Sequence, residues 1–261
     1  MNNHPIGIFD SGVGGLSVWR ELVKVLPGES MIYLADSANC PYGPRSHDEI
    51  KQLSSINVDF LLELEAKMIV VACNTATAAA IDFLREKYDI PFIGMEPAVK
   101  PAALNSETGH IGVLATAGTF DGRLYKETSK KFASGVHVHT QIGHGLVELV
   151  EKGNYESPET YTMLEKYLNP MLREKADHIV LGCTHYPFLI PAIKKIIGKK
   201  AVIIDPSPAV ARRTADQLKT FELNAVKTHK AKYTFYSTGD LIPLQNLLND
   251  ICDFNVEVRA R

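Results

Sequence analysis

The sequence predicts an α/β protein made of two similar lobes, each with a largely parallel sheet and helices around it. Two observations support this prediction. Short apolar runs, typical of buried parallel strands, alternate along the 261 residues with longer segments of helical periodicity. The chain also matches itself weakly at an offset of about 105 to 110 residues, which indicates two copies of one α/β unit.

Eight apolar runs, bounded by turn-forming or polar residues, are predicted strands. They are Ile6–Phe9, Met31–Ala35, Met68–Ala72, Phe92–Met95, Ile111–Ala115, Val136–Thr140, His178–Leu181 and Val202–Ile204. Among the intervening helical segments, Ser46-His47-Asp48-Glu49 has the pattern of a capping box. It predicts a helix that begins there and continues to about Ala66.

The internal repeat defines the expected domain organisation. Three landmarks align in order: Ile6–Ser11 with Ile111–Thr116, Ile69–Asn74 with Ile179–Thr184, and Ile93–Pro97 with Ile203–Ser207. Glu96-Pro97 and Asp205-Pro206 are predicted crossover points, because a residue before proline is pushed out of the helical region. We expect a first lobe of residues 1–96 plus 207–261, a second lobe of 97–206, and an active site in the cleft between them.

Composition narrows the class of protein. The chain is 45% hydrophobic and 22% charged, as in ordinary globular proteins, and its formal net charge of −2 argues against a partner with a phosphate backbone. The N-terminus has no basic and apolar signal segment, and stretches such as Met68–Cys73 are far shorter than the roughly 20 residues that span a bilayer. We therefore expect a cytoplasmic protein that binds neither nucleic acid nor membrane.

The four cysteines do not form the dense framework of a secreted scaffold, so thiols are expected. Cys40 and Cys252 are interpreted as structural. Cys73 and Cys183 occupy equivalent places in the repeat, each after an apolar strand and before the start of a helix. Open α/β sheets bind ligands at this edge, and a helix N-terminus favours a thiolate.

Two thiols on opposite sides of a cleft suit one reaction above others. Inversion of a carbon acid requires a base on one face to remove a proton and an acid on the other to return one. A thiol with the ordinary pKa of about 8.5 needs a tuning neighbour, and Asp10 and His185 are the candidates. Alternative interpretations are two packed thiols, a helix-capping or loop Asp10 and a solvent-facing His185.

Two further motifs concern ligands. Ser11–Ser17 is a glycine-rich turn from strand to helix whose N–H groups can face an anion. Because it lacks the lysine and spacing of nucleotide-binding loops, it is interpreted as a carboxylate site. His137, His139 and His144 have no carboxylate or cysteine near them in sequence, so no metal is expected.

Four motifs together resemble the glutamate racemase family of the aspartate/glutamate racemase superfamily. They are Phe9-Asp10-Ser11-Gly12-Val13-Gly14-Gly15, Pro41-Tyr42-Gly43, Ala72-Cys73-Asn74-Thr75-Ala76 and Gly182-Cys183-Thr184-His185-Tyr186-Pro187. The resemblance implies that Cys73 acts on D-glutamate and Cys183 on L-glutamate, with Asp10 and His185 assisting. It also implies the substrate-binding residues, namely Asp10, Ser11, Tyr42, Gly43, Asn74, Thr75, Thr184 and His185.

The resemblance carries further expectations. Such an enzyme supplies D-glutamate for peptidoglycan without pyridoxal phosphate, any other cofactor or metal, and works as a homodimer of two-lobed chains. Glu151 matches an acidic residue of the family and is a further candidate for substrate binding, although the segment that precedes it, from Gly143, is unusual. No long N-terminal extension is present, so no activation by a cell-wall precursor is expected.

Three alternatives remain open from the sequence. The chain could be another enzyme of the same superfamily, such as an aspartate or hydantoin racemase or a decarboxylase that uses one cysteine. It could be an amino-acid binding module in which the cysteines are only packed. It could also be a redox protein with a Cys73–Cys183 disulfide, although it lacks a Cys-x-x-Cys motif.

Overall fold

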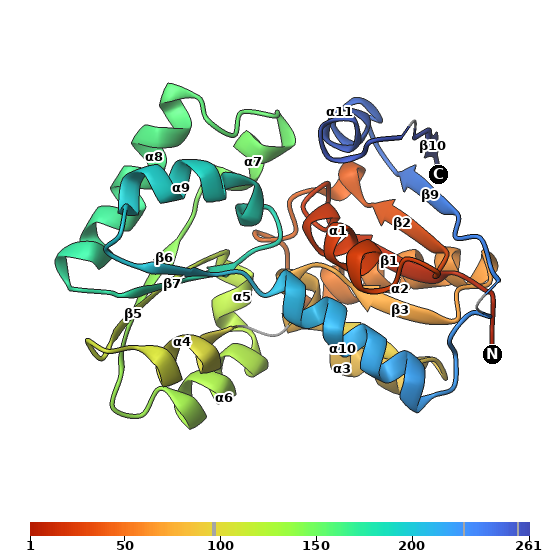
Figure 1. Ribbon diagram of the computed structural model, residues 1–261, viewed down its shortest axis with the longest axis horizontal. Helices are drawn as coiled ribbons and strands as arrows, with labels where there is room; N and C mark the ends of the chain where they lie inside the picture. The colour runs from red at the N-terminus through yellow and green to blue at the C-terminus, as the bar shows by residue number, and fades with distance from the viewer. Residues whose placement is uncertain (96–97, 227, 255) are drawn as a thin grey trace.

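Two parallel sheets organise the protein in the computed structural model, which describes residues 1–95, 98–226, 228–254 and 256–261. The first sheet contains β1 (Ile6–Asp10), β2 (Met31–Ala35), β3 (Met68–Val71), β4 (Phe92–Gly94), β9 (Tyr233–Ser237) and β10 (Val258–Ala260). The second contains β5 (His110–Ala115), β6 (His137–Ile142), β7 (His178–Gly182) and β8 (Val202–Ile204). The strand orders are β10-β9-β2-β1-β3-β4 and β6-β5-β7-β8. The predicted α/β fold with two parallel sheets is confirmed, and Figure 1 shows the sheets in separate halves.

Helices cover both faces of each sheet. On the first sheet α1 (Leu16–Val25), α10 (Ser207–Thr220) and α11 (Ile242–Ile251) share one apolar core, whereas α2 (His47–Glu63) and α3 (Asn74–Lys87) share the core of the other face. On the second sheet α8 (Pro158–Arg173) and α9 (Ile190–Ile197) lie on one face, and α4 (Val99–Asn105) and α6 (Arg123–Phe132) on the other. The shorter α5 (Ala117–Asp121), α7 (Leu146–Glu151) and the 3-10 helices η1 (Ser37–Asn39) and η2 (Tyr186–Leu189) lie in loops. None of the helices within the described ranges is both long and apolar enough to cross a membrane.

The internal repeat is visible in the strand order. Strands β2-β1-β3-β4 follow one another in the first sheet as β6-β5-β7-β8 do in the second. The predicted landmarks therefore correspond to the strand pairs β1/β5, β3/β7 and β4/β8. The predicted crossover at Glu96-Pro97 lies outside the described residues, and the division of the chain there stays a prediction. Asp205 follows β8, and Pro206 is the N-cap residue of α10.

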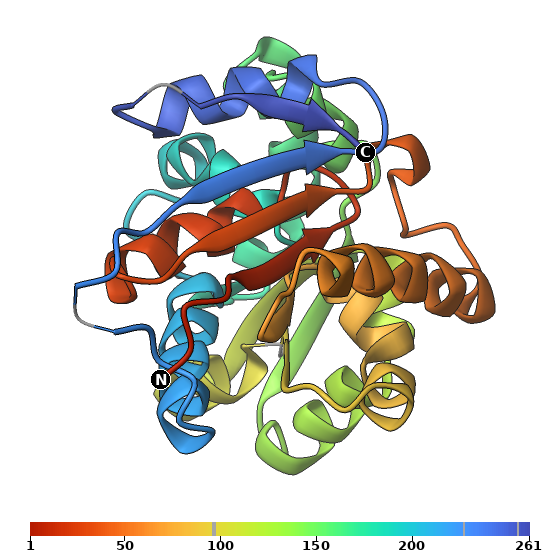
Figure 2. The same ribbon diagram turned by 90° about the vertical axis from the view of Figure 1, so that its right-hand side faces the viewer.

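The first sheet holds two strands that were not predicted. β9 pairs with β2, and β10 pairs with β9 at the edge, so the last part of the chain completes the sheet begun by the first (Figure 2). Three of the five β9 residues are only partly buried, and β10 has one buried residue. Neither segment has the apolar run on which strand prediction depends.

Helix α2 begins where the capping pattern predicts. The Ser46 hydroxyl accepts the Glu49 N–H at 3.3 Å. The helix ends at Glu63 rather than Ala66 because Glu65 adopts a left-handed conformation with φ 60°, a conformation common just past helix ends.

A buried ion pair ties the N-terminal segment to the start of β3. Lys67 Nζ lies 2.5 Å from Glu29 Oε2, and the two side chains are 1% and 6% exposed. Lys67 also donates to the Asn2 carbonyl at 2.6 Å, and Glu29 Oε1 accepts the Ala225 N–H at 2.8 Å. Four segments distant in sequence therefore meet at two buried charges.

Candidate active site

Cys73 stands at the carboxyl end of β3, where it caps the N-terminus of α3. Its Sγ accepts the Ala76 N–H at 3.4 Å, and its thiol donates to Ser11 Oγ at 3.8 Å. Burial, together with the charge of Asp10, raises the pKa of the Cys73 thiol well above its usual range, while the Ala76 N–H opposes this effect. The shift favours the protonated thiol of Cys73.

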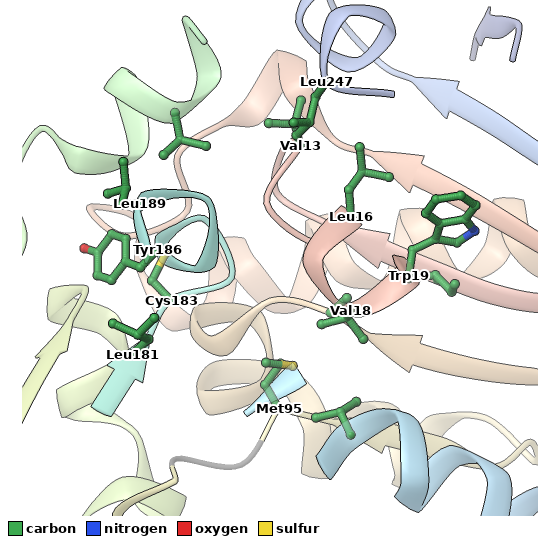
Figure 3. Packing of buried hydrophobic residues seen from close by; sticks show 14 of the residues in the cluster. Val13, Leu16, Val18, Trp19, Met95, Leu181, Cys183, Tyr186, Leu189 and Leu247 are labelled. Carbon is green, nitrogen blue, oxygen red and sulfur yellow. The ribbon is translucent and has the colours of Figure 1, made fainter. Parts of the chain in front are cut away.

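Cys183 stands at the equivalent end of β7 and contacts an imidazole. Its Sγ lies 3.7 Å from His185 Nδ1, and His185 Nε2 lies 2.6 Å from Glu151 Oε1. Figure 3 shows the sulfur beside the Tyr186 ring, within the apolar cluster between the two sheets. His185 Nδ1 is thus the polar atom that faces this sulfur.

His185 and Glu151 form an ion pair. Burial alone would lower the pKa of His185, but its hydrogen bonds to Cys183, Cys40 and Glu151 outweigh that effect and raise the pKa well above the ordinary value. Burial would raise the pKa of Glu151, but the contact with His185 keeps it below the ordinary value. A protonated imidazole beside Cys183 stabilises negative charge on that sulfur.

Asp10 lies at the end of β1 and is fully buried. Its Oδ2 accepts the N–H groups of Gly15 at 2.9 Å and Gly12 at 3.3 Å, and its Oδ1 accepts the Thr184 hydroxyl at 3.4 Å. Burial raises the pKa of Asp10, although the charge of His185 opposes the shift. Asp10 therefore holds the glycine-rich turn and joins it to the residue after Cys183.

The sequence predicts that the N–H groups of the glycine-rich turn bind the carboxylate of a ligand. For three of these N–H groups the prediction is wrong. Gly12 and Gly15 donate to Asp10, and Val13 donates to Glu151 Oε1 at 2.8 Å. The protein's own carboxylates use the donors that the motif provides. No feature of the motif itself reveals that these carboxylates are already in place.

Both thiols line one small pocket between the two sheets. It is nearly closed, with a cavity volume of about 10 Å³, and most of the predicted site residues surround it, namely Ser11, Tyr42, Gly43, Cys73, Asn74, Thr75, Cys183, Thr184 and His185. Asp10 and Glu151, also predicted to bind substrate, are not among the lining residues and lie behind Thr184 and His185. A hollow of about 220 Å³ adjoins the pocket and shares Pro41, Gly43, Thr116 and Val147 with it. The hollow therefore forms an outer vestibule to a nearly closed pocket.

Three lining residues were not predicted, namely Pro41, Thr116 and Val147. Thr116 follows β5 as Ser11 follows β1, so the internal repeat already aligned it with a predicted site residue. Its hydroxyl lies 2.9 Å from that of Thr75 and 2.9 Å from that of Thr119, which donates to the Gly182 carbonyl at 3.2 Å. This chain of hydroxyl groups connects Thr75, just after Cys73, with Gly182, just before Cys183.

Asn74 brings unused hydrogen-bonding capacity to the pocket. Its side-chain oxygen and nitrogen are both buried and have no partner among the described residues. Buried amides without partners are costly, so such a group in a pocket is suited to a ligand that offers both an acceptor and a donor. The described lining residues include no lysine or arginine, so neutral donors and His185 surround the pocket.

Tyr42 is anchored away from solvent by a polar network. Its hydroxyl donates to Asp36 Oδ2 at 2.5 Å and accepts from Asn57 Nδ2 at 3.1 Å. Arg261 Nη1 donates to Asn57 Oδ1 at 2.8 Å, which orients the amide toward Tyr42. The network holds the Tyr42-Gly43 wall of the pocket.

We expect Tyr42→Phe to lower the free energy of unfolding by about 1.5 to 3 kcal/mol, because a buried carboxylate loses a donor. Chemical denaturation measures the change. Tyr161→Phe is the matched control, since the Tyr161 hydroxyl donates to the exposed side chain of Glu156 and its loss should cost about 0.5 kcal/mol or less. Equal effects of the two substitutions would contradict the anchoring role of Tyr42.

Gly14 allows the imidazole of His185 to approach the turn. A Cβ atom at Gly14 would lie 2.3 Å from His185 Nδ1, the atom that contacts Cys183. We expect Gly14→Ala to displace the ring and lower any Cys183-dependent turnover by about 100-fold, since small misplacements of reacting groups have effects of that order. Steady-state rates measure this loss. Gly28→Ala is the control, because a Cβ there meets no atom within 4 Å, and a similar loss in both variants would refute the explanation.

The remaining histidines and cysteine lie apart from the pocket. His139 Nε2 lies 3.0 Å from His110 Nδ1, and His137 stacks on His110, whereas His144 faces the vestibule. Cys252 is partly buried at the end of α11.

A duplicated α/β fold with one thiol from each half at a shared pocket is the arrangement expected of a racemase, an isomerase that inverts a stereocentre, and the comparisons with known proteins agree. Residues 6–214 match the family described as Asp/Glu/Hydantoin racemase. The glutamate racemase of Roseiflexus sp. (strain RS-1) is 46% identical over 254 residues, which cover 95% of this chain and 93% of that protein.

Solved structures agree with this relationship. The glutamate racemase of Escherichia coli, in complex with L-glutamate and the activator UDP-MurNAc-ala, has a TM-score of 0.86 at 33% identity, covering 98% of each chain. That of Francisella tularensis, in complex with D-glutamate, has a TM-score of 0.84 at 29% identity, covering 99% of this chain and 98% of that one. The chain belongs to the Asp/Glu/Hydantoin racemase family.

Proposed function

We propose that the protein interconverts L-glutamate and D-glutamate through proton transfer by Cys73 and Cys183, and thereby supplies D-glutamate for peptidoglycan. The observation that carries the proposal is the shared pocket, which the two thiols enter from equivalent strand ends of the two sheets. The Roseiflexus relative, similar over almost its whole length, is a glutamate racemase, and the E. coli and F. tularensis relatives are described with bound glutamate. A cytoplasmic location and a homodimer are parts of the same proposal.

The environments of the thiols suit conversion of the L enantiomer first. Cys183, beside protonated His185, acts as the thiolate that removes the α-proton of L-glutamate. The electron pair of the broken C–H bond remains on the substrate, delocalised into its α-carboxylate. Cys73, held as a thiol, returns a proton to the opposite face and becomes the thiolate.

The reverse reaction starts from the other ionisation state. The Ala76 N–H and the N-terminus of α3 then stabilise the charge on Cys73, which removes the α-proton of D-glutamate. Cys183 returns the proton on the L face. Glu151 acts through His185 in both directions, as a positioning residue that keeps the imidazole charged beside Cys183.

The polar wall suits an α-amino acid. The unused amide of Asn74 offers a donor to a carboxylate and an acceptor to an ammonium group. Ser11 and Thr75 line the same pocket, and their hydroxyls can supply further neutral donors. Asp10 takes part indirectly, by holding Thr184 and the glycine-rich turn.

Circular dichroism of each glutamate enantiomer, incubated with dialysed protein, tests the substrate. Decay of both signals to zero is the expected result. Racemisation of aspartate but not glutamate would assign another activity of the family. Binding of glutamate without any change in its signal would favour the amino-acid binding module.

A further inference from the structure

Three side chains of the types that bind metals lie close together behind the pocket. They lie on the side of the His185 ring that faces away from Cys183. They are Cys40, Glu151 and His185, whose ligand atoms all lie within 4.8 Å of one another. Cys40 Sγ is 3.6 Å from Glu151 Oε1, and His185 Nε2 is 2.6 Å from the same oxygen. They come from three separate segments, after η1, at the end of α7 and after β7, so no sequence spacing indicates the cluster.

We propose that Cys40, Glu151 and His185 form an inhibitory binding site for a thiophilic divalent cation of the Zn²⁺ class. Thiolate, imidazole and carboxylate are the donors of tetrahedral zinc sites. With metal–ligand distances of about 2.0 to 2.3 Å, ligand atoms in such a site lie about 3.3 to 3.7 Å apart. The Cys40–Glu151 distance already fits, and the His185–Glu151 pair has to open by less than about 1 Å.

Two neighbouring residues hold the cluster in place. The Val13 N–H donates to Glu151 Oε1 and holds the carboxylate in place, as second partners of metal ligands do. Gly12 lies against the cluster, since a Cβ there would be 2.0 Å from Glu151 Oε1 and 3.0 Å from Cys40 Sγ. With three protein ligands, the fourth position of the ion remains available to water.

The expected inhibition rests on the proposed function, whereas the binding itself does not. Nε2 is the ring nitrogen that faces Glu151, and Nδ1 is the one that faces Cys183. A cation between Nε2 and Glu151 forces this pair apart and so moves Nδ1 relative to Cys183 Sγ. The proposed function requires the imidazole in place beside Cys183, so a bound cation slows racemisation in both directions.

Cobalt is the probe for the site, because Co²⁺ adopts tetrahedral zinc sites and a thiolate ligand adds a charge-transfer absorption band. The titration uses the full-length Cys73→Ser/Cys183→Ser protein, so that neither active-site thiol contributes. We expect one Co²⁺ per chain with the thiolate band, displaced by Zn²⁺. Adding Cys40→Ser should abolish the band, and adding Cys252→Ser should leave it unchanged. A band that survives Cys40→Ser, or no bound Co²⁺, would overturn the proposal.

Two further measurements separate binding from inhibition. Glu151→Gln in the same background should weaken Co²⁺ binding at least 10-fold while keeping the thiolate band at saturation. With both active-site thiols present, Zn²⁺ should slow racemisation reversibly on chelation, and Cys40→Ser should raise the inhibitory concentration at least 10-fold. If the protein does not racemise glutamate, the cobalt titration still decides whether the site exists.

Discussion

Replacing either Cys73 or Cys183 with serine is expected to lower kcat/KM for glutamate racemisation by about 10² to 10⁴-fold in both directions, the usual contribution of a general acid or base. A serine hydroxyl keeps the shape of the side chain but cannot serve as the base near neutral pH. Both directions are expected to slow because, in the proposed mechanism, each thiol is the base for one enantiomer and the acid for the other.

Deuterium exchange in D₂O distinguishes the two sides. Cys73→Ser should still exchange the α-proton of L-glutamate slowly without inversion, through Cys183, and should leave D-glutamate unlabelled. Cys183→Ser should show the opposite preference. Cys252→Ser is the control and should racemise normally, because this thiol lies outside the pocket. Normal racemisation by Cys73→Ser would eliminate the two-thiol mechanism.

Lys67→Met is expected to lower the free energy of unfolding by about 3 to 5 kcal/mol, because it leaves the Glu29 carboxylate buried without its cation. In a protein of this size this corresponds to a fall in Tm of about 6 to 20 °C. The Asn2 carbonyl also loses its donor. Thermal and denaturant unfolding, followed by circular dichroism, measure the loss.

Lys24→Met is the matched control. Lys24 pairs with Glu21 at a similar distance, 2.7 Å, but its side chain is 61% exposed, and surface pairs of this kind contribute about 0 to 1 kcal/mol. If the two substitutions destabilise the protein equally, burial is not what gives the Lys67 pair its importance.

The strands that could be predicted from the sequence are those that carry their own signal. β1, β3, β5 and β7 are continuous apolar runs because both faces of a central parallel strand are buried. β9 lacks such a run, since it mixes aromatic and polar residues, and it belongs to the sheet through its pairing with β2. Its partner strand lies about 200 residues earlier in the chain, so a local window of sequence does not show the pairing.

The candidate site also contains some residues that could be predicted from the sequence and others that could not. Cys73, Cys183 and the residues beside them were predictable, because each stands at a strand end within its own motif. The repeat held the information for Thr116, by aligning it with Ser11. The contact of Cys40 with Glu151 was not predictable, since it depends on how the two sheets come together. Sequence motifs therefore identified the two candidate thiols, and only the tertiary structure revealed what lies behind them.

The late arrival of β9 has a consequence during synthesis on the ribosome. Every strand of the second sheet is contained in residues 110–204, so that sheet can form while residues 233–237 are still untranslated. Until β9 emerges, β2 presents an unpaired edge, which is the kind of surface that nascent chains use to aggregate. The second sheet, in the middle of the polypeptide, should therefore fold before the first sheet is complete. Protection by a chaperone should matter most for the first sheet.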